Sequence, residues 1–228
     1  MDRRSFLTNG LTAATAVTLG SSIAQAAEPA KKLKIIGISC SPRKAKTTFQ
    51  ALHICLEAAQ QVSPAIEVEL FELAGIKFDP AVAAGVPSVF GSEDAFESVI
   101  QPKLADPSIA GIIIGTPVYF GMPSALCKGF IDRCMVFRKT FALSNKVAGV
   151  VAVGGMRNGG QELSINAVQQ CLITQEMVLV GDGRPTAHRG ATVWNNKDDI
   201  STDTVGIETL KNLGRRVAEV VLKLNPAS

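Results

Sequence analysis

Leu33-Lys34-Ile35-Ile36-Gly37-Ile38-Ser39 is the stretch that decides the fold of this chain. The run is almost continuously apolar, which is typical of a parallel strand that is buried on both faces. The segment 47–62 follows with apolar residues at helical spacing, and predicts a helix that begins near Thr47 or Thr48. A buried strand followed by an amphipathic helix is the first unit of an α/β sheet.

The same alternation continues along the chain. Further strands are predicted at 66–72, 109–115, 147–153 and 177–180. Helices are predicted at 92–104 with Ser92 as cap, from Pro123 onward, at 160–175 and at 204–224, and segment 182–199 is predicted to be loop. This order predicts an α/β fold with a doubly wound, five-stranded parallel sheet in the order 2-1-3-4-5 and helices on both faces. Its switch point lies between strands one and three.

The first 26 residues predict an export signal. Arg3-Arg4 precedes Ser5-Phe6-Leu7, a mildly apolar stretch and the small-residue end Ala24-Gln25-Ala26. The paired arginines resemble a twin-arginine signal, so we expect cleavage after Ala26 and a periplasmic protein. The predicted organisation is a signal at 1–26, a flexible lead-in at 27–32 and one domain at 33–228; the alternative is an N-terminal tail that is retained.

Composition excludes several classes of protein. A net charge of +3 is too small to predict a nucleic-acid partner, and the apolar stretch of the signal is too polar to predict a stable membrane anchor. The five cysteines are odd in number and include no C-x-x-C pair, so neither a metal site nor a disulfide framework is predicted. Most of the cysteines are expected to be buried as small apolar residues, although Cys40, which directly precedes Ser41, could be exposed in a loop. A single disulfide stays open as an alternative.

Three polar or glycine-rich loops directly follow predicted strands, at the sheet edge where ligands bind in open α/β folds. The first is Ser41-Pro42-Arg43-Lys44-Ala45-Lys46-Thr47-Thr48, which supplies hydroxyls and positive charge at the start of a helix. Free N–H groups at a helix N-terminus favour phosphate. The loop has neither the P-loop pattern nor G-x-G-x-x-G, and the alternative is an ordinary polar turn that caps the helix.

The second and third loops suit a flat ligand. Thr116-Pro117-Val118-Tyr119-Phe120-Gly121 places two aromatic rings between Pro117, expected to fix the turn, and Gly121. The alternative is a pair of aromatic side chains that fill the core. Gly154-Gly155-Met156-Arg157-Asn158-Gly159-Gly160 lets the backbone approach a ligand closely, and Arg157 could stabilise negative charge; the alternative is a flexible loop.

Ser41 to Lys44, Thr116 to Gly121, Phe130-Ile131-Asp132-Arg133 and Gly154 to Glu162 together resemble the flavodoxin-like NADPH-dependent FMN reductase family, and its iron–sulfur flavoprotein branch most closely. The resemblance runs from about Leu33 to Gly181. It implies a flavodoxin-like fold, FMN bound without a covalent bond, NAD(P)H as a possible electron donor, and a homo-dimer or tetramer. A small-molecule electron acceptor or a redox protein would be the partner.

The resemblance also assigns roles to residues. It implies that the phosphate is held by Ser41, Arg43, Lys44, Thr47 and Thr48. It implies that the ring system is lined by Pro117, Val118, Tyr119, Phe120 and Gly121, and closed in by Gly154, Gly155, Arg157, Asn158 and Gly159. Asp132 and Arg133 are expected to form a structural ion pair or an interface contact. No catalytic side chain is expected, because the flavin carries the chemistry, and His53 and His188 are expected to be structural or solvated.

Two departures from the family pattern limit what it implies. The stretch Lys77 to Gly85 lacks the cysteines of the iron–sulfur branch, so we predict no cluster and no metal. Met156 stands where the family usually has glycine. The leading hypothesis is an FMN-dependent oxidoreductase that passes electrons to a quinone, a flavin or another small acceptor. The alternatives are an exported electron-transfer protein without its own substrate turnover, and a binding module that has lost its cofactor. A subunit contact is predicted in segment 182–199, around Trp194.

Overall fold

The central strands are almost wholly buried, as their apolar sequences predict. They are β1 (Leu33–Ser39), β3 (Ile109–Tyr119) and β5 (Val147–Gly154). The computed structural model describes residues 32–226, so the predicted signal and nearly all of the lead-in lie outside the described residues. With β2 (Ile66–Glu72) and β6 (Val178–Leu179), the strands form a parallel sheet in the order β2-β1-β3-β5-β6. The predicted order 2-1-3-4-5 is therefore confirmed.

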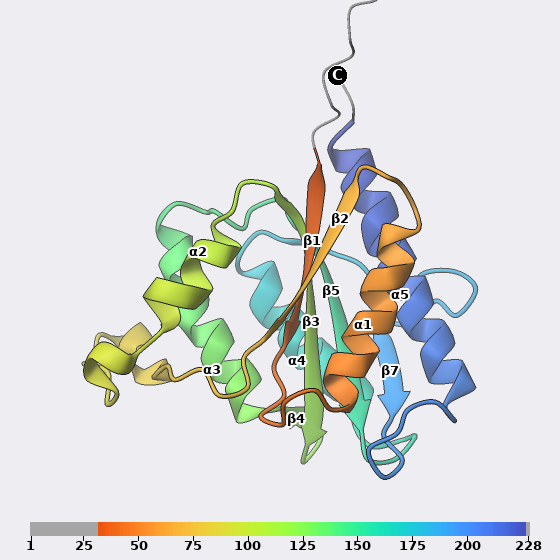
Figure 1. Ribbon diagram of the computed structural model, residues 1–228, viewed down its shortest axis with the longest axis horizontal. Helices are drawn as coiled ribbons and strands as arrows, with labels where there is room; N and C mark the ends of the chain where they lie inside the picture. Colours follow the sequence, from red (N-terminus) through yellow and green to blue (C-terminus); the bar gives the residue numbers. More distant parts are fainter. Residues whose placement is uncertain (1–31, 227–228) are drawn as a thin grey trace, which may run out of the picture. The chain divides into compact units, whose positions relative to one another are not determined.

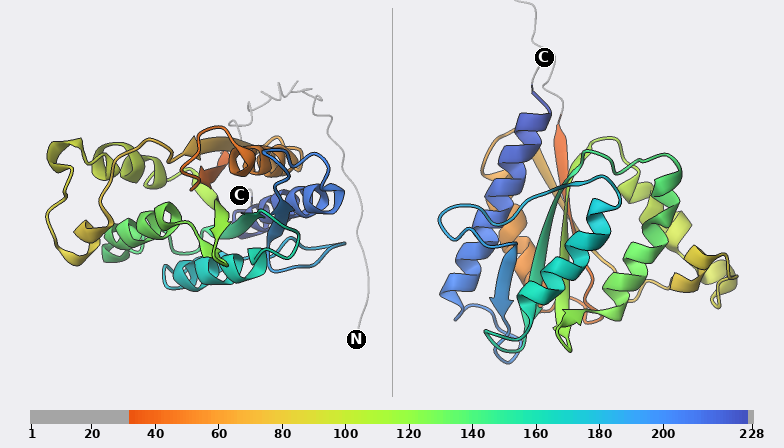
Figure 2. Two further views of the ribbon diagram at one scale, coloured as in Figure 1. Left: turned by 90° about the horizontal axis from the view of Figure 1, so that it is seen from below. Right: turned by 180° about the vertical axis from the view of Figure 1, so that it is seen from behind.

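Helices cover both faces of the sheet. Figure 1 shows α1 (Thr47–Gln60) and α5 (Thr204–Leu224) on one side, with α2 (Gln101–Leu104) and α3 (Ala125–Arg133) on the other. Figure 2 shows α4 (Gln161–Ile173) on the same side as α3. Side chains alternate across each strand, so β1 supplies Ile35 to the core under α1 and α5, and Ile36 to the core under α3 and α4.

The outermost strand is split into two pieces, which the sequence analysis did not predict. β6 pairs with the start of β5, at Val147 and Ala148. A second short strand, β7 (Ala191–Trp194), pairs with the end of β5 and lies within the segment predicted to be loop. Ala191 and Val193 are fully buried, and side chains at the start of α5 accept the remaining N–H groups: Thr209 Oγ1 accepts from the Thr192 N–H at 3.2 Å, and Asp203 Oδ2 accepts from the Trp194 N–H at 2.7 Å. Four residues are too short a run for alternation to identify a strand.

Two predicted helix starts are wrong. Segment 92–104 is not one helix capped by Ser92: it is a 3₁₀ turn (Gly91–Glu93), a π-helical turn (Phe96–Ile100) and α2. Asp94, not Ser92, supplies the side-chain contact at the start of the π-helical turn, because its Oδ1 accepts from the Phe96 N–H at 3.1 Å. Pro123 does not begin a helix but lies in the short strand β4 (Met122–Pro123), and Ser124 caps α3 by accepting from the Cys127 N–H at 3.0 Å. Two further 3₁₀ turns cover Pro80–Ala84 and Cys134–Lys139.

All five cysteines are free thiols, and Cys40 is fully buried rather than exposed. It follows β1 with the parity that points into the core beneath α3, and burial raises the pKa of its thiol well above the usual value. Burial likewise raises the pKa of Cys55 and Cys134. Only Cys171 is partly exposed.

We therefore expect iodoacetamide to label Cys171 first in the folded protein, because a buried, protonated thiol reacts slowly. Peptide mass spectrometry of native and urea-unfolded samples checks this. If Cys40 were labelled as fast as Cys171 in the native sample, this would contradict the burial of Cys40 at the start of the first loop.

None of the helices within residues 32–226 is long and apolar enough to cross a membrane.

Candidate functional site

The three loops predicted from the sequence meet at one edge of the sheet, at the carboxyl ends of β1, β3 and β5 (Figure 1). The root of the first loop is tied to β3, since the Cys40 N–H donates to the Gly115 carbonyl at 2.8 Å. Ser124, which follows the second loop, donates its hydroxyl to the Cys40 carbonyl at 2.7 Å. The second and third loops touch: a Cβ on Gly160 would lie 2.7 Å from the Cα of Gly121. The structure thus joins all three segments.

The first loop surrounds an uncapped helix N-terminus. Among residues 32–226, no side chain caps the first turn of α1, and that turn contains no acidic residue. Thr47 and Thr48 begin the helix and are buried, whereas Arg43 and Lys44 are exposed. Ser41 is buried and shapes the loop, because its hydroxyl accepts the Arg43 N–H at 3.1 Å. Uncapped N–H groups beside three cations, Lys46 included, form a favourable place for a phosphate.

A carboxylate that the sequence analysis did not identify lies against this loop. Asp198 Oδ1 is 2.6 Å from Arg43 Nη1, and Oδ2 is 3.2 Å from Lys46 Nζ. The hydrogen bonds from Arg43 and Lys46 hold the pKa of Asp198 below its usual range, so it is ionised at neutral pH. Asp198 is 155 residues from Arg43 in sequence, and no local pattern could have linked them.

The second loop is the tip of a β-hairpin. Strand β3 continues through Pro117, which is paired with Val153, so Pro117 does not make the turn. Phe120 and Gly121 make it, with φ of 52° and 75°, and the chain returns through β4. Phe120 is fully exposed and Tyr119 is 47% exposed, which excludes the alternative that the two rings fill the core. Pro117 and Val118 are half-buried, so the tip, rather than the whole segment, offers an aromatic surface.

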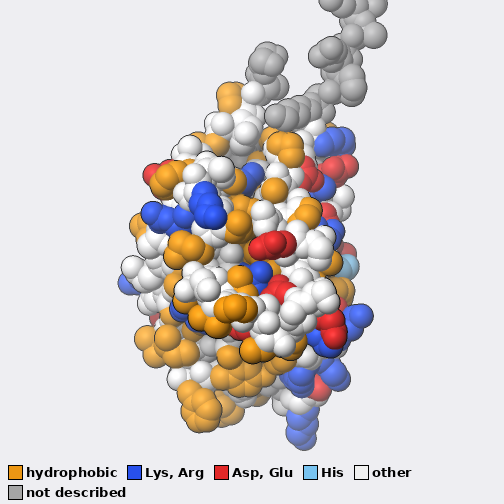
Figure 3. Space-filling model, turned by 90° about the vertical axis from the view of Figure 1, so that its left-hand side faces the viewer, with side chains coloured by type: hydrophobic (Ala, Val, Ile, Leu, Met, Phe, Trp, Pro, Cys, Tyr) orange, Lys and Arg blue, Asp and Glu red, His pale blue; other side chains and the backbone are white. Residues whose placement is uncertain are grey.

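Hydrophobic side chains are concentrated at this edge. Figure 3 shows them gathered at the lower end of the face that looks out from α2 and α3. They include the rings of Tyr119 and Phe120, and also Met122, Met156 and Leu163, the last three of which are each more than half exposed. Met156 is therefore free to contact a ligand at the sheet edge.

The buried side chain of Gln161 organises the third loop. Its Nε2 donates to the Met156 carbonyl at 2.7 Å, and its Oε1 accepts the Gly159 N–H at 2.8 Å. A Cβ on Gly154 would lie 2.5 Å from that Nε2, so a larger residue there would displace the Gln161 amide. Gly155 is exposed, and its carbonyl accepts from Trp194 Nε1 at 3.0 Å. Hydrogen bonds from the Gln161 and Trp194 side chains therefore hold the third loop in shape, contrary to the alternative of a flexible loop.

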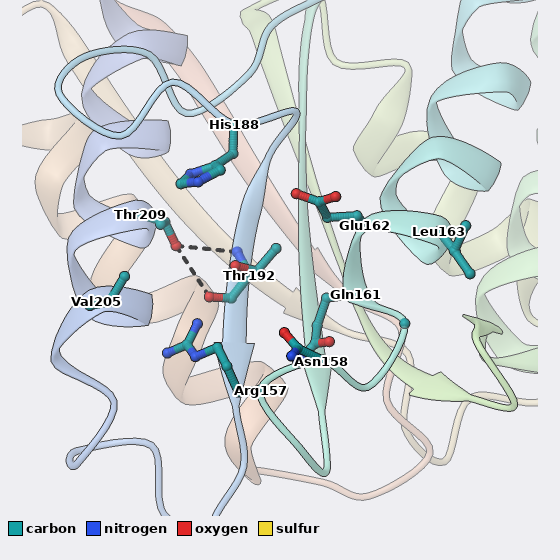
Figure 4. A pocket seen from close by; sticks show the side chains of 10 residues that line it. Arg157, Asn158, Gln161, Glu162, Leu163, His188, Thr192, Val205 and Thr209 are labelled. Atoms are coloured by element: carbon teal, nitrogen blue, oxygen red, sulfur yellow. Dashed lines mark hydrogen bonds between the residues drawn. The ribbon is translucent and has the colours of Figure 1, made fainter.

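Arg157 and Asn158 face a hollow of about 550 Å³ on the β7 side of the third loop (Figure 4). The Arg157 guanidinium pairs with Asp203, whose other contacts include the N–H groups of Gly206 and Trp194. The structure thus places the Arg157 side chain against the start of α5, between β7 and the third loop. Of the predicted glycines of this loop, Gly154 is buried, Gly159 is half-buried and Gly155 is exposed.

Both histidines have structural contacts. His53 is exposed on α1, with its Nδ1 3.5 Å from Glu57. His188 lies at the hollow in Figure 4, with Nδ1 3.2 Å from the fully buried carboxylate of Asp182. Asp182 also accepts from the His188 N–H and the Thr186 hydroxyl, so it anchors the excursion between β6 and β7.

Asp132 and Arg133 form ion pairs, but not with each other. Asp132 pairs with Lys128 at 2.6 Å on the exposed side of α3. Arg133 is buried and pairs with Asp94 at 2.7 Å, donates to the Asp79 carbonyl at 3.0 Å, and lies 4.6 Å from the centre of the Phe96 ring. The ion pair between Arg133 and Asp94 therefore holds the irregular segment 77–95 against α3. This segment contains no cysteine.

The model of the family described as NADPH-dependent FMN reductase matches residues 33–192, more than half of the chain. The chain belongs to this family. An iron–sulfur flavoprotein of Methanocaldococcus jannaschii is 41% identical over 194 residues, which cover 83% of this chain and 97% of that relative. An NAD(P)H dehydrogenase (quinone) of Aromatoleum aromaticum is 28% identical over 192 residues, covering 77% and 90%.

The fold agrees with the family. The apo crystal structure of an NADH:FMN oxidoreductase superposes with a TM-score of 0.56 at 19% identity, over 82% of this chain and 89% of that one. The protein is an FMN-dependent oxidoreductase, as the sequence analysis expected. The predicted assignment of individual residues to the phosphate and the ring stays a prediction.

The residues present fit FMN. The hydroxyl of Ser39 is buried at the carboxyl end of β1, next to the first loop, and has no hydrogen-bond partner in the part of the chain that the structure describes. The uncapped start of α1 lies beside it, with Arg43, Lys44 and Lys46 exposed around it. The aromatic tip of the second loop and the glycine backbone of the third complete a surface for a phosphate at one end and a flat ring at the other.

The residues present do not fit an iron–sulfur cluster. Within residues 32–226, no group of three or more His, Cys, Asp or Glu side chains is arranged to hold a metal ion. Segment 77–85 is instead organised by Asp79, whose carboxylate accepts the N–H groups of Ala81 and Val89, each at 2.9 Å. The prediction that no cluster is present continues to rest on the missing cysteines.

Proposed function

We propose that this enzyme transfers electrons from NAD(P)H through bound FMN to a quinone, a flavin or another small acceptor. The observation that carries the proposal is the meeting of a phosphate-type loop, an aromatic hairpin tip and a glycine-rich loop at one sheet edge. FMN, when bound, supplies the capacity to accept a hydride from a nicotinamide and to release its electrons to the acceptor. The names of two relatives, an NAD(P)H dehydrogenase (quinone) and an NADH:FMN oxidoreductase, support this donor and these acceptors.

The chain's own residues would bind and orient the cofactor. Ser41, Thr47, Thr48 and the first N–H groups of α1 would hold the phosphate, with Arg43 and Lys44 neutralising its charge. Tyr119 and Phe120 would contact the ring, and the backbone of Gly154, Gly155 and Gly159 would close around its edge. Both histidines make structural contacts, so neither is assigned a role in proton transfer. Solvent would supply any proton that the flavin needs.

We also propose that the protein is exported and works as a homo-dimer or tetramer. The support for export is the run from Arg3-Arg4 to Ala26. The support for assembly is the exposed hydrophobic group at the site edge, which includes Phe120, Met122 and Leu163. N-terminal sequencing of the mature protein and mass measurement in solution test the two statements separately.

Anaerobic reduction tests the proposed reaction. We expect NADPH to bleach the visible flavin bands of the FMN-loaded protein within seconds, and we expect steady NADPH oxidation when a soluble quinone is added. Dithionite provides the control, because it reduces flavin without a nicotinamide site. Bands that disappear with dithionite but persist with NADPH and NADH would contradict the reductase and favour the electron-transfer protein.

A further inference from the structure

The turn that follows β7 joins the first and third loops. At its start, the Asn195 N–H donates to the Gly154 carbonyl at 2.8 Å. At its tip, the Asp198 carboxylate spans Arg43 and Lys46. The turn (195–199) therefore brings Asp198 to the first loop, whereas the sequence analysis assigned this segment to a loop with a subunit contact and not to the flavin site.

The turn presents Asp198 in a fixed geometry. Asn196 and Asp199 exchange backbone hydrogen bonds at 2.8 and 3.0 Å, which closes the turn over two residues. Those residues, Lys197 and Asp198, have φ of 51° and 66° in the left-handed region. The Asp198 N–H also donates to Asn195 Oδ1 at 2.8 Å. A turn closed in this way holds the carboxylate toward the first loop.

We propose that Asp198 is an internal competitor for the phosphate subsite, and that it sets the strength with which the site prefers a phosphorylated flavin. This inference rests on the proposed FMN site. A carboxylate that bridges two cations uses the same donors that a phosphate would use. The phosphate dianion must either displace Asp198 or bind beside a like charge, and both lower its affinity.

The charges near the loop make the competition substantial. Arg43, Lys44 and Lys46 are its cations, and Asp198 is paired with two of them. Glu72 also approaches the loop, where its Oε1 accepts the Ala45 N–H at 2.9 Å, but it makes no ion pair with these cations within residues 32–226. Asp198 is therefore the carboxylate whose removal frees cationic donors.

Asp198→Asn tests the proposal in the full chain. Asparagine tolerates a left-handed φ, so the turn is expected to keep its shape. Fluorescence titration should give a Kd for FMN that is about three- to tenfold lower than in the wild type, because two exposed ion pairs no longer compete. Riboflavin lacks the phosphate, so its Kd should change by less than about twofold.

Asp199→Asn is the matched control. It removes the same charge one residue away, but Asp199 contacts the N–H and hydroxyl of Ser201 rather than the first loop. Its FMN affinity should equal that of the wild type. Weaker FMN binding in Asp198→Asn would show that Asp198 positions the cations, and would overturn the proposed competition. An unchanged Kd for FMN, or an equal gain in affinity for FMN and riboflavin, would also overturn it. Failure of folded wild type and Asp198→Asn to bind either flavin would overturn the proposed function itself.

Discussion

Replacing Gly160 by alanine should disrupt the flavin site and weaken the fold together. Gly160 has φ of 94°, which disfavours any residue with a Cβ, and the new atom would lie 2.7 Å from the Cα of Gly121. Backbone cannot yield as a flexible side chain does, so the hairpin tip must move. We expect the free energy of unfolding to fall by about 2–4 kcal/mol, since left-handed strain and overpacking add. The Kd for FMN should rise about tenfold or more, the equivalent of about 1.4 kcal/mol.

Gly155→Ala is the control for this prediction. Gly155 lies in the same loop and is exposed, but a Cβ there would meet nothing within 4 Å among residues 32–226. Urea unfolding of both variants should separate them, because Gly155→Ala adds no clash within the described chain. An equal loss of stability in the two variants would mean that the contact between the second and third loops does not constrain the third loop.

Replacing Asp94 by asparagine should destabilise the protein by about 3–5 kcal/mol, because Arg133 would remain buried without its partner charge. Arg133 and Asp94 are only 5% and 10% exposed. The control is Asp132→Asn, which breaks an exposed pair on the same helix and should cost less than about 1 kcal/mol. Urea titrations at neutral pH measure both values.

The buried pair of Asp94 and Arg133 also makes the stability of the protein depend on pH. Burial by itself would raise the pKa of Asp94, but hydrogen bonds from Arg133, the Asp79 N–H and Ser88 outweigh it and hold the pKa well below the usual 3.8. A carboxyl whose pKa is lowered by folding stabilises the protein above its unfolded pKa and loses that contribution as the pH falls. Wild-type stability should therefore fall below about pH 4, and more steeply than that of Asp94→Asn. Parallel pH profiles would contradict this assignment.

Sequence periodicity was sufficient to predict the central sheet. Strands such as β1 and β5 are buried on both faces, so their apolar runs identify them without tertiary information. The predicted order followed from strand–helix alternation and the handedness of crossovers. Periodicity failed where side-chain hydrogen bonds decide the backbone: Asp94 starts an irregular turn, and Thr209 satisfies the outward edge of β7.

The candidate site, like the fold, could be predicted from the sequence only in part. The three loops were predictable because each directly follows a buried strand of one sheet edge. The directions of side chains were not: Arg157 turns to Asp203, and Pro117 continues its strand. Asp198 reaches the first loop only through tertiary folding, from a turn at the end of a four-residue strand. Such long-range contacts carry no local signal in a single sequence.

The central claim is that the three loops form one site for a phosphorylated flavin. The most direct measurement is a titration of flavin-free protein with FMN, followed by flavin fluorescence and by equilibrium dialysis. We predict saturable binding of one FMN per chain, which weakens when Arg43 and Lys44 are both replaced by alanine while riboflavin binding changes little. Absence of saturable binding by folded wild-type protein, or FMN affinity that is indifferent to both cations, would contradict it.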